Sequence, residues 1–96
     1  LILGDNDGNS ASAEIIKAAY SALENSGKDL QHNQPFKGGF ITRYFGNPSV
    51  NVHALQLEMV KTNYMNDTET DYHQERADQI RVTLHQVFKQ LIEALS

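Results

Sequence analysis

Six consecutive residues decide the fold of this chain: His53-Ala54-Leu55-Gln56-Leu57-Glu58. Side chains of a β-strand alternate between its two faces. The resulting apolar face carries Leu55, Leu57 and Met59, and the other carries Ala54, Gln56 and Glu58. The run from residue 50 to residue 60 is too apolar for a surface strand. It predicts a strand at residues 52–58 that is covered on both faces, as in α/β proteins.

Glu58 is the acidic residue at the end of this stretch. A carboxylate on a covered strand is costly unless it is paired, hydrated in a cleft or used in chemistry. The simplest interpretation is a strand-end glutamate that reaches solvent or pairs with a lysine such as Lys61. The functional interpretation is a general acid and base beside a metal-bound water, which takes a proton and returns it to a leaving amine. The residues alone leave both interpretations open.

Helical periodicity flanks this strand on both sides. Apolar residues at three-and-four spacing predict one helix at residues 11–25, with Ser10 or Ser12 as its N-cap. The same spacing predicts a second helix at residues 71–95, with Gln74 placed to close a capping box. This second helix is short for a coiled coil and lacks regular opposed charges, so we expect it to pack on its own sheet.

The remaining segments are shorter or irregular. Residues 1–3 predict a short strand that ends at Gly4, and residues 29–33 are weakly patterned. Residues 34–49 predict a long connection without regular structure, and such connections are usually functional or disordered. Its large apolar side chains argue against disorder. The order of strand, helix, weak segment, loop, strand and helix predicts an α/β fold.

The composition excludes several classes of protein. The formal net charge is −4, from 8 basic and 12 acidic residues, and the scattered basic residues argue against a nucleic-acid partner. No apolar run is long enough for a signal peptide or a membrane span, so no membrane partner is expected. The absence of Cys excludes disulfides and thiolate metal sites, and it fits a cytoplasmic location.

The length of the chain, 96 residues, suits one small domain or part of a larger one. The chain opens on Leu1-Ile2-Leu3-Gly4 without a Met, so we expect residues 1–96 to be a single unit cut from a longer protein. A lone piece of an α/β sheet buries little surface. We therefore expect marginal stability without the rest of the parent domain, which is the expected protein partner.

Three segments resemble one enzyme family. They are Leu3-Gly4-Asp5-Asn6-Asp7-Gly8-Asn9-Ser10, Pro35-Phe36-Lys37-Gly38-Gly39-Phe40-Ile41-Thr42-Arg43-Tyr44-Phe45-Gly46, and the stretch that ends at Glu58. In this order they look like the C-terminal part of N-formylglutamate amidohydrolases. The resemblance implies a mixed-sheet, three-layer, carboxypeptidase-like (phosphorylase/hydrolase-like) fold with a strand at residues 29–33. It also implies a zinc-dependent hydrolysis of a small molecule, N-formyl-L-glutamate, to L-glutamate and formate in histidine degradation.

The resemblance implies roles for individual residues as well. It favours Glu58 as the catalytic acid and base. Arg43 is then a candidate clamp for a substrate carboxylate, because a guanidinium group binds carboxylates through two N–H groups; the alternative is a solvated loop arginine. Lys37 is a second candidate for that contact. Gly39 is a candidate for close approach of the backbone to a ligand, although a tight turn explains the Gly38-Gly39 pair more simply.

No metal site is expected within the chain itself. The histidines His32, His53, His73 and His85 form neither H-E-x-x-H nor H-x-x-E spacing. His53 lies five residues before Glu58 and so points to the opposite face of a regular strand, which favours a structural role. The resemblance implies Zn²⁺ ligands upstream of Leu1. Two alternatives stay open: a related metallohydrolase for another N-acyl amino acid or small peptide, and a non-catalytic binding domain that keeps the fold.

Overall fold

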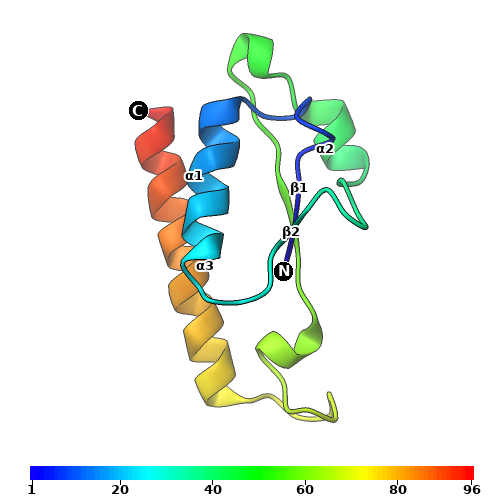
Figure 1. Cartoon of the computed structure of the whole chain (residues 1–96), viewed down its shortest axis with the longest axis vertical. Coiled ribbons are helices and arrows are strands. Elements are labelled where there is room, and N and C mark those ends of the chain that lie inside the picture. Colours follow the sequence, from blue (N-terminus) through cyan, green and yellow to red (C-terminus); the bar gives the residue numbers. More distant parts are fainter.

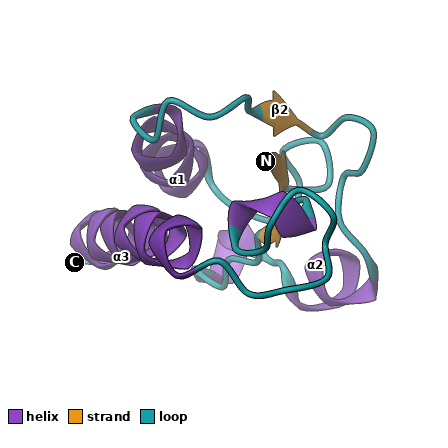
Figure 2. Cartoon of the chain, turned by 90° about the horizontal axis from the view of Figure 1, so that it is seen from below, coloured by secondary structure: helices purple, strands orange, loops and turns teal.

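The computed structural model describes all residues from 1 to 96. A small sheet stands between helices, and its strands are β1 (Ile2–Gly4), β2 (Gln31–His32) and β3 (Gln56–Glu58). Two long helices, α1 (Ala13–Glu24) and α3 (Gln74–Leu95), lie side by side on one side of it (Figure 1). The short helix α2 (Phe40–Phe45) lies across the sheet from them, as the view from below also shows (Figure 2). The predicted α/β class is confirmed.

The sheet is mixed, with the strand order β2-β1-β3. β1 and β2 run parallel, with Ile2 opposite Gln31, and α1 lies in the crossover that a parallel pair requires. β1 and β3 run antiparallel, with Ile2 opposite Glu58. The short strand expected at the start of the chain is therefore present, and β2 lies within the weakly patterned residues 29–33.

The apolar core lies between the sheet and the two long helices. Its buried members are Leu3, Ala19, Ala22, Leu23 and Val87. Leu55 and Leu57 pack against this cluster, and both line, together with Met59, a cavity of about 310 Å³ whose walls are entirely apolar. The predicted apolar face of the strand is therefore confirmed.

The opposite face of β3 has little cover in this chain. Glu58 is exposed and Gln56 is half-buried. The six-residue α2 meets this face only near its N-terminus, where the N–H of Gly39 donates to the side chain of Gln56. The prediction of cover on both faces is therefore wrong for this chain, because no element of the chain covers Glu58 on this side.

β3 is also shorter than the predicted residues 52–58. Val52 forms an isolated bridge with Asn47 instead of pairing with β1. The turn between these two residues contains a short 3-10 helix, Pro48–Val50, followed by Asn51 in the left-handed conformation with φ of 59°. This local pairing uses the backbone groups that a longer strand would offer to the sheet.

α1 begins at Ala13 instead of residue 11. Ser12 occupies the N-cap position, as one of the two predicted candidates, but its side chain makes no capping hydrogen bond. The backbone N–H of Ser12 instead donates to Nδ1 of His53 at 3.1 Å. This contact ties the start of α1 to the segment that leads into β3.

α3 begins at Gln74 instead of residue 71. His73 is its N-cap, and the ring atom Nδ1 accepts the N–H of Arg76 at 3.2 Å, so the predicted capping box with Gln74 is wrong. The helix packs on its own core, as predicted, through Ala77, Ile80 and Val87. Other apolar residues of the predicted stripe are exposed, namely Phe88, Ile92 and Leu95. Neither long helix has the length and apolarity that crossing a membrane requires.

The segment 34–49 is not the irregular connection that we predicted, because it contains α2. Thr42 is buried, and its Oγ1 donates to the carbonyl of Gly39 at 2.7 Å. Phe40 stacks on Tyr44, one helical turn away, with 5.0 Å between ring centroids. Tyr44 also meets Phe45 edge to face at 4.9 Å. These local contacts stabilise a short helix between glycine and proline residues that mask it in the sequence.

Candidate functional site

Gln56 joins two of the predicted site residues. Its amide oxygen accepts the N–H of Gly39 at 2.8 Å, and its amide nitrogen donates to Oε1 of Glu58, also at 2.8 Å. The second contact follows from the period of two, because alternate residues of β3 share a face. The first contact brings the N-terminus of α2 to that same face. Glu58 and Gly39 therefore belong to one candidate site although they are distant in the sequence.

Glu58 ends β3 with its side chain exposed. The bond from Gln56 is the one hydrogen bond to its carboxylate, so Oε2 has no partner within the chain. No ion pair joins Glu58 to Lys61, which was one form of the simplest interpretation. A carboxylate with one oxygen oriented and the other free can accept a proton and return it.

Two glycines let the backbone close around this site. Gly38 has φ of 112°, which side chains rarely adopt, and a Cβ there would collide with the side chain of Thr42. A Cβ on Gly4 would lie only 2.7 Å from the carbonyl carbon of Lys37, so β1 approaches the same segment closely. Gly39 has ordinary space around it, and its N–H is already used by Gln56. Gly38 and Gly4 therefore allow the backbone to pack closely, whereas the N–H of Gly39 anchors Gln56.

Arg43 and Lys37 lie on either side of the Gly38-Gly39 pair in the sequence and differ in their partners. Arg43 is exposed in the last turn of α2, and its Nη1 donates to the carbonyl of Gly38 at 3.4 Å. No carboxylate pairs with Arg43. Lys37 pairs with Asp7, with 2.8 Å between Nζ and Oδ2. Arg43 therefore offers free N–H groups to an anionic ligand, whereas Lys37 already has an acidic partner.

A buried carboxylate at the end of β1 escaped the sequence analysis. Asp5 accepts the N–H of Gly8 at 2.7 Å, Nδ2 of Asn33 at 2.7 Å and the ring N–H of His32. Burial, the largest single influence, raises the pKa of Asp5. The hydrogen bonds from His32, Asn33 and Gly8, together with the charge of His32, outweigh burial and hold the pKa below its ordinary value.

This buried cluster joins the ends of β1 and β2. The sequence Asp5-Asn6-Asp7-Gly8 marks a turn, but the contact of Asp5 with His32 depends on the parallel pairing of β1 with β2. A two-residue strand leaves no readable pattern, so no local signal in the sequence predicts that pairing. Because both oxygens of Asp5 are engaged, the cluster has a structural role.

No three His, Asp or Glu side chains gather closely enough to hold a metal ion. His53 accepts the N–H of Ser12 through Nδ1, which leaves Nε2 protonated and able to donate to Oδ1 of Asn51 at 2.8 Å. Both ring nitrogens are thus engaged, in agreement with the predicted structural role of His53.

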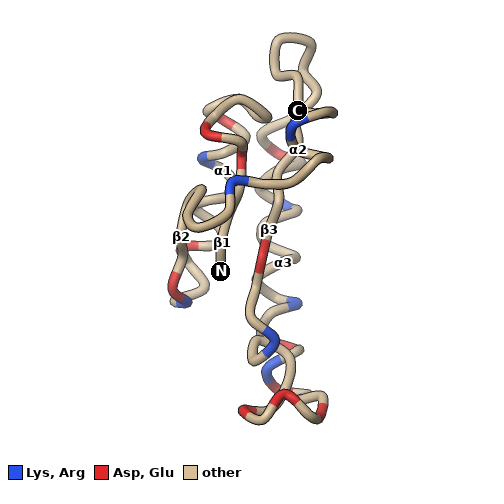
Figure 3. Tube along the Cα trace, turned by 90° about the vertical axis from the view of Figure 1, so that its right-hand side faces the viewer, with Lys and Arg blue, Asp and Glu red and all other residues tan.

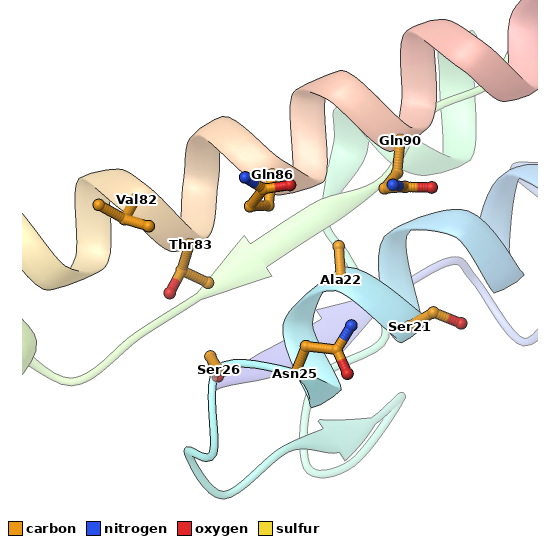
Figure 4. Close-up of a pocket in the computed structure, with 8 residues that line it drawn as sticks. All are labelled: Ser21, Ala22, Asn25, Ser26, Val82, Thr83, Gln86 and Gln90. Carbon is orange, nitrogen blue, oxygen red and sulfur yellow. The ribbon is translucent and has the colours of Figure 1, made fainter.

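The cavity between the two long helices is separate from the candidate site. A cavity of about 360 Å³ lies between α1 and α3, as Figure 4 shows, with Asn25, Gln86 and Gln90 among its uncharged lining residues. None of the predicted site residues lines it, and it contains no titratable side chain. The lysine and arginine residues are spread along the whole trace instead of forming a stripe (Figure 3).

Comparisons with known proteins agree on one family. The profile of the N-formylglutamate amidohydrolase family matches residues 1–65. An N-formylglutamate deformylase of Pseudomonas aeruginosa PAO1 is 38% identical over 96 residues, which is 97% of this chain and 34% of the relative. An N-formylglutamate deformylase of Pseudomonas putida is 44% identical over 64 residues, which is 66% of this chain and 22% of the relative.

A solved structure extends this likeness to the fold. The crystal structure of N-formylglutamate amidohydrolase from Ralstonia eutropha JMP134 superimposes with a TM-score of 0.75 at 22% identity, covering 97% of this chain and 32% of that one. The chain thus spans about a third, or less, of the length of the proteins it matches. The profile match covers more than half of the chain and includes Arg43, Gln56 and Glu58. The chain therefore belongs to the N-formylglutamate amidohydrolase family.

Proposed function

We propose that this chain forms the C-terminal part of an enzyme that hydrolyses N-formyl-L-glutamate to L-glutamate and formate, a step of histidine degradation. The observation that carries the proposal is the family match across residues 1–65, which includes both Arg43 and Glu58. The names of the two Pseudomonas relatives support a deformylase. Zinc and a carboxypeptidase-like parent domain are part of the proposal. Because this chain gathers no metal-binding group, the zinc ligands would come from outside it.

Glu58 is the general acid and base of this proposal. Its carboxylate takes a proton from water while the water oxygen forms a bond to the formyl carbon. The C–N bond then breaks, and the carboxylic acid returns the proton to the leaving amine. Formate and glutamate are released, and Glu58 is ionised again. The exposed position of Glu58 and its unpartnered Oε2 suit such an exchange of protons.

Arg43 is the substrate clamp of this proposal. N-formylglutamate carries two carboxylates, and a guanidinium group without an acidic partner can bind one of them with two charge-assisted hydrogen bonds. The position of Arg43 supports this role, because α2 begins at the segment that also holds Gln56. Lys37 is the weaker candidate, since a substrate carboxylate would have to compete with Asp7 for its ammonium group.

The decisive experiment is Glu58→Gln in the full-length protein, assayed by formate release from N-formyl-L-glutamate. Gln keeps the size of the side chain and loses the proton acceptor. We expect kcat to fall at least ~100-fold, the usual scale for general acid-base help, while substrate binding is retained. A near-normal kcat would reject the catalytic role.

The substrate itself needs a separate experiment, because a clamp of this kind recognises a carboxylate that many N-acyl amino acids share. The full-length protein should therefore be assayed on a panel of N-acyl amino acids and small peptides. Preference for N-formyl-L-glutamate supports the proposal, and preference for another member of the panel replaces the substrate. Binding without turnover of any member would favour a non-catalytic binding domain.

A further inference from the structure

Gln56 is placed to control the geometry of the candidate site. We propose that Gln56 is a positioning residue that orients the carboxylate of Glu58 and fixes its place relative to Arg43. This inference rests on the proposed function, since it gives Gln56 a role only through Glu58 and the substrate clamp. Sequence reasoning passed over Gln56, because an uncharged polar residue on a strand carries no catalytic signal of its own.

The orientation of the Gln56 amide is determined by its neighbours. A backbone N–H can only donate, so the group that faces the N–H of Gly39 at 2.8 Å must be the amide oxygen. The NH₂ group must then point the other way, toward Oε1 of Glu58 at 2.8 Å. A flipped amide would set two donors against each other at Gly39 and two acceptors against each other at Glu58. Oε1 of Glu58 is therefore a fixed acceptor, and Oε2 is the oxygen left for the reacting proton.

The anchor behind Gln56 is rigid. The carbonyl of Gly39 accepts Oγ1 of Thr42 at 2.7 Å and the N–H of Arg43 at 3.2 Å. Thr42 is only 2% exposed, so this end of the linkage is fixed in the packed part of the molecule. An exposed glutamate otherwise samples several rotamers, and ordering it has an entropic cost. The bond from Gln56 lowers the number of rotamers that Glu58 samples before substrate arrives.

The same linkage fixes the clamp. Arg43 donates its backbone N–H to the carbonyl of Gly39, the residue that holds Gln56, and its guanidinium N–H to the carbonyl of the neighbouring Gly38. One continuous path of hydrogen bonds then runs from Glu58 through Gln56 and Gly39 to Arg43. A substrate held by its carboxylate at Arg43 would present its amide bond at a set distance from Glu58. Small errors in such distances can cost on the order of 100-fold in rate.

Two substitutions in the full-length protein test this role. Gln56→Glu keeps an oxygen for the N–H of Gly39 but replaces the donor to Glu58 by a second carboxylate. Gln56→Met keeps the length of the side chain and removes both hydrogen bonds. We expect kcat to fall by roughly 10- to 100-fold in both variants. In Gln56→Met, KM should change by a smaller factor than kcat. Gln90→Glu, the same chemical change at an exposed position of α3, is the matched control and should leave kcat unchanged.

A double-mutant cycle with Glu58→Gln shows whether Gln56 acts through Glu58. If it does, Gln56→Glu should cause little further loss of kcat once Glu58 is already Gln. An equal loss in both backgrounds would overturn the inference. So would a rise in KM with unchanged kcat in Gln56→Met, which would make Gln56 only an anchor for α2.

The cycle also separates this inference from the proposed function. If Glu58→Gln lowers kcat and both Gln56 variants do not, Glu58 keeps its catalytic role and Gln56 loses the positioning role. If Glu58→Gln leaves kcat normal, the catalytic role itself fails and this inference fails with it. Thermal unfolding of each variant, compared with the parent protein, checks that a loss of kcat does not come from loss of the fold.

Discussion

The two faces of β3 differ in how they are stabilised. Leu55 and Leu57 pack against the core cluster beneath α1 and α3, where contacts are apolar and without direction. Gln56 and Glu58, on the other face, are exposed or half-buried and are held by directed hydrogen bonds. Burial of apolar area supplies the free energy of folding, whereas directed bonds fix where a reactive group stands. The comparison predicts that substitutions on the apolar face cost stability and those on the polar face cost activity.

The largest effect is expected for Leu23→Ala, which truncates a residue of α1 in the core cluster that the apolar face of β3 packs against. Leu23 is fully buried and lines the existing cavity of about 310 Å³, so removal of its side chain enlarges a space that the neighbours do not fill. We expect the free energy of unfolding of the full-length protein to fall by about 2–5 kcal/mol. Urea unfolding followed by circular dichroism measures this change, and kcat of the folded fraction should be preserved.

The matched control comes from the other face. Glu58→Gln removes no buried group, so the free energy of unfolding should change by less than about 0.5 kcal/mol. Comparable losses of stability in Leu23→Ala and Glu58→Gln would break the contrast between the two faces.

A smaller effect, on substrate binding, is expected for Arg43→Ala. Loss of a charge-assisted contact with a substrate carboxylate corresponds to roughly 1.5–3 kcal/mol if the contact is dry, and it should appear as a raised KM. Steady-state kinetics of formate release measure it. Lys37→Ala is the control, and it should raise KM less because Lys37 already pairs with Asp7. Unchanged kinetics in a folded Arg43→Ala protein would return Arg43 to the role of a solvated arginine.

The sequence revealed the contrast between the two faces because its cause is local. A period of two over residues 54–59 separates Leu57 from Glu58 wherever the strand lies. The apolar stripes of α1 and α3 are local signals as well, which is why both helices were predicted to within a few residues. The start of β3 was misjudged because it depends on a competing turn, in which Val52 pairs with Asn47.

Contacts that join distant segments were not predictable. The bond between Gly39 and Gln56 exists only because α2 lies across the sheet, and α2 itself was hidden by the glycines and prolines around it. The same holds for Asp5 and His32, which meet through a strand pair of two residues. The residues alone left the roles of Glu58 and Arg43 open, and the family resemblance favoured the functional interpretation of both. For Gln56 and Asp5, by contrast, the contacts that define their roles can be read only after the topology is known.

The buried Asp5 cluster sharpens the comparison, because it is polar and yet has a structural role. Asp5→Asn should lower the free energy of unfolding by about 1–3 kcal/mol at neutral pH, since it removes the charge that strengthens the hydrogen bonds from Gly8, His32 and Asn33. The folded state holds the pKa of Asp5 below its ordinary value, so the stabilisation is present above about pH 4 and is lost as the pH falls through the folded-state pKa.

Asp5→Asn should therefore make the free energy of unfolding less dependent on pH in the acid range, as measured by urea unfolding at several pH values. Asp67→Asn is the control, because its ion pair with Arg76 is exposed and should contribute little. An unchanged pH dependence in the acid range in Asp5→Asn would show that Asp5 does not stabilise the fold in this way. A loss of kcat in a fully folded protein would instead indicate that Asp5 takes part in catalysis.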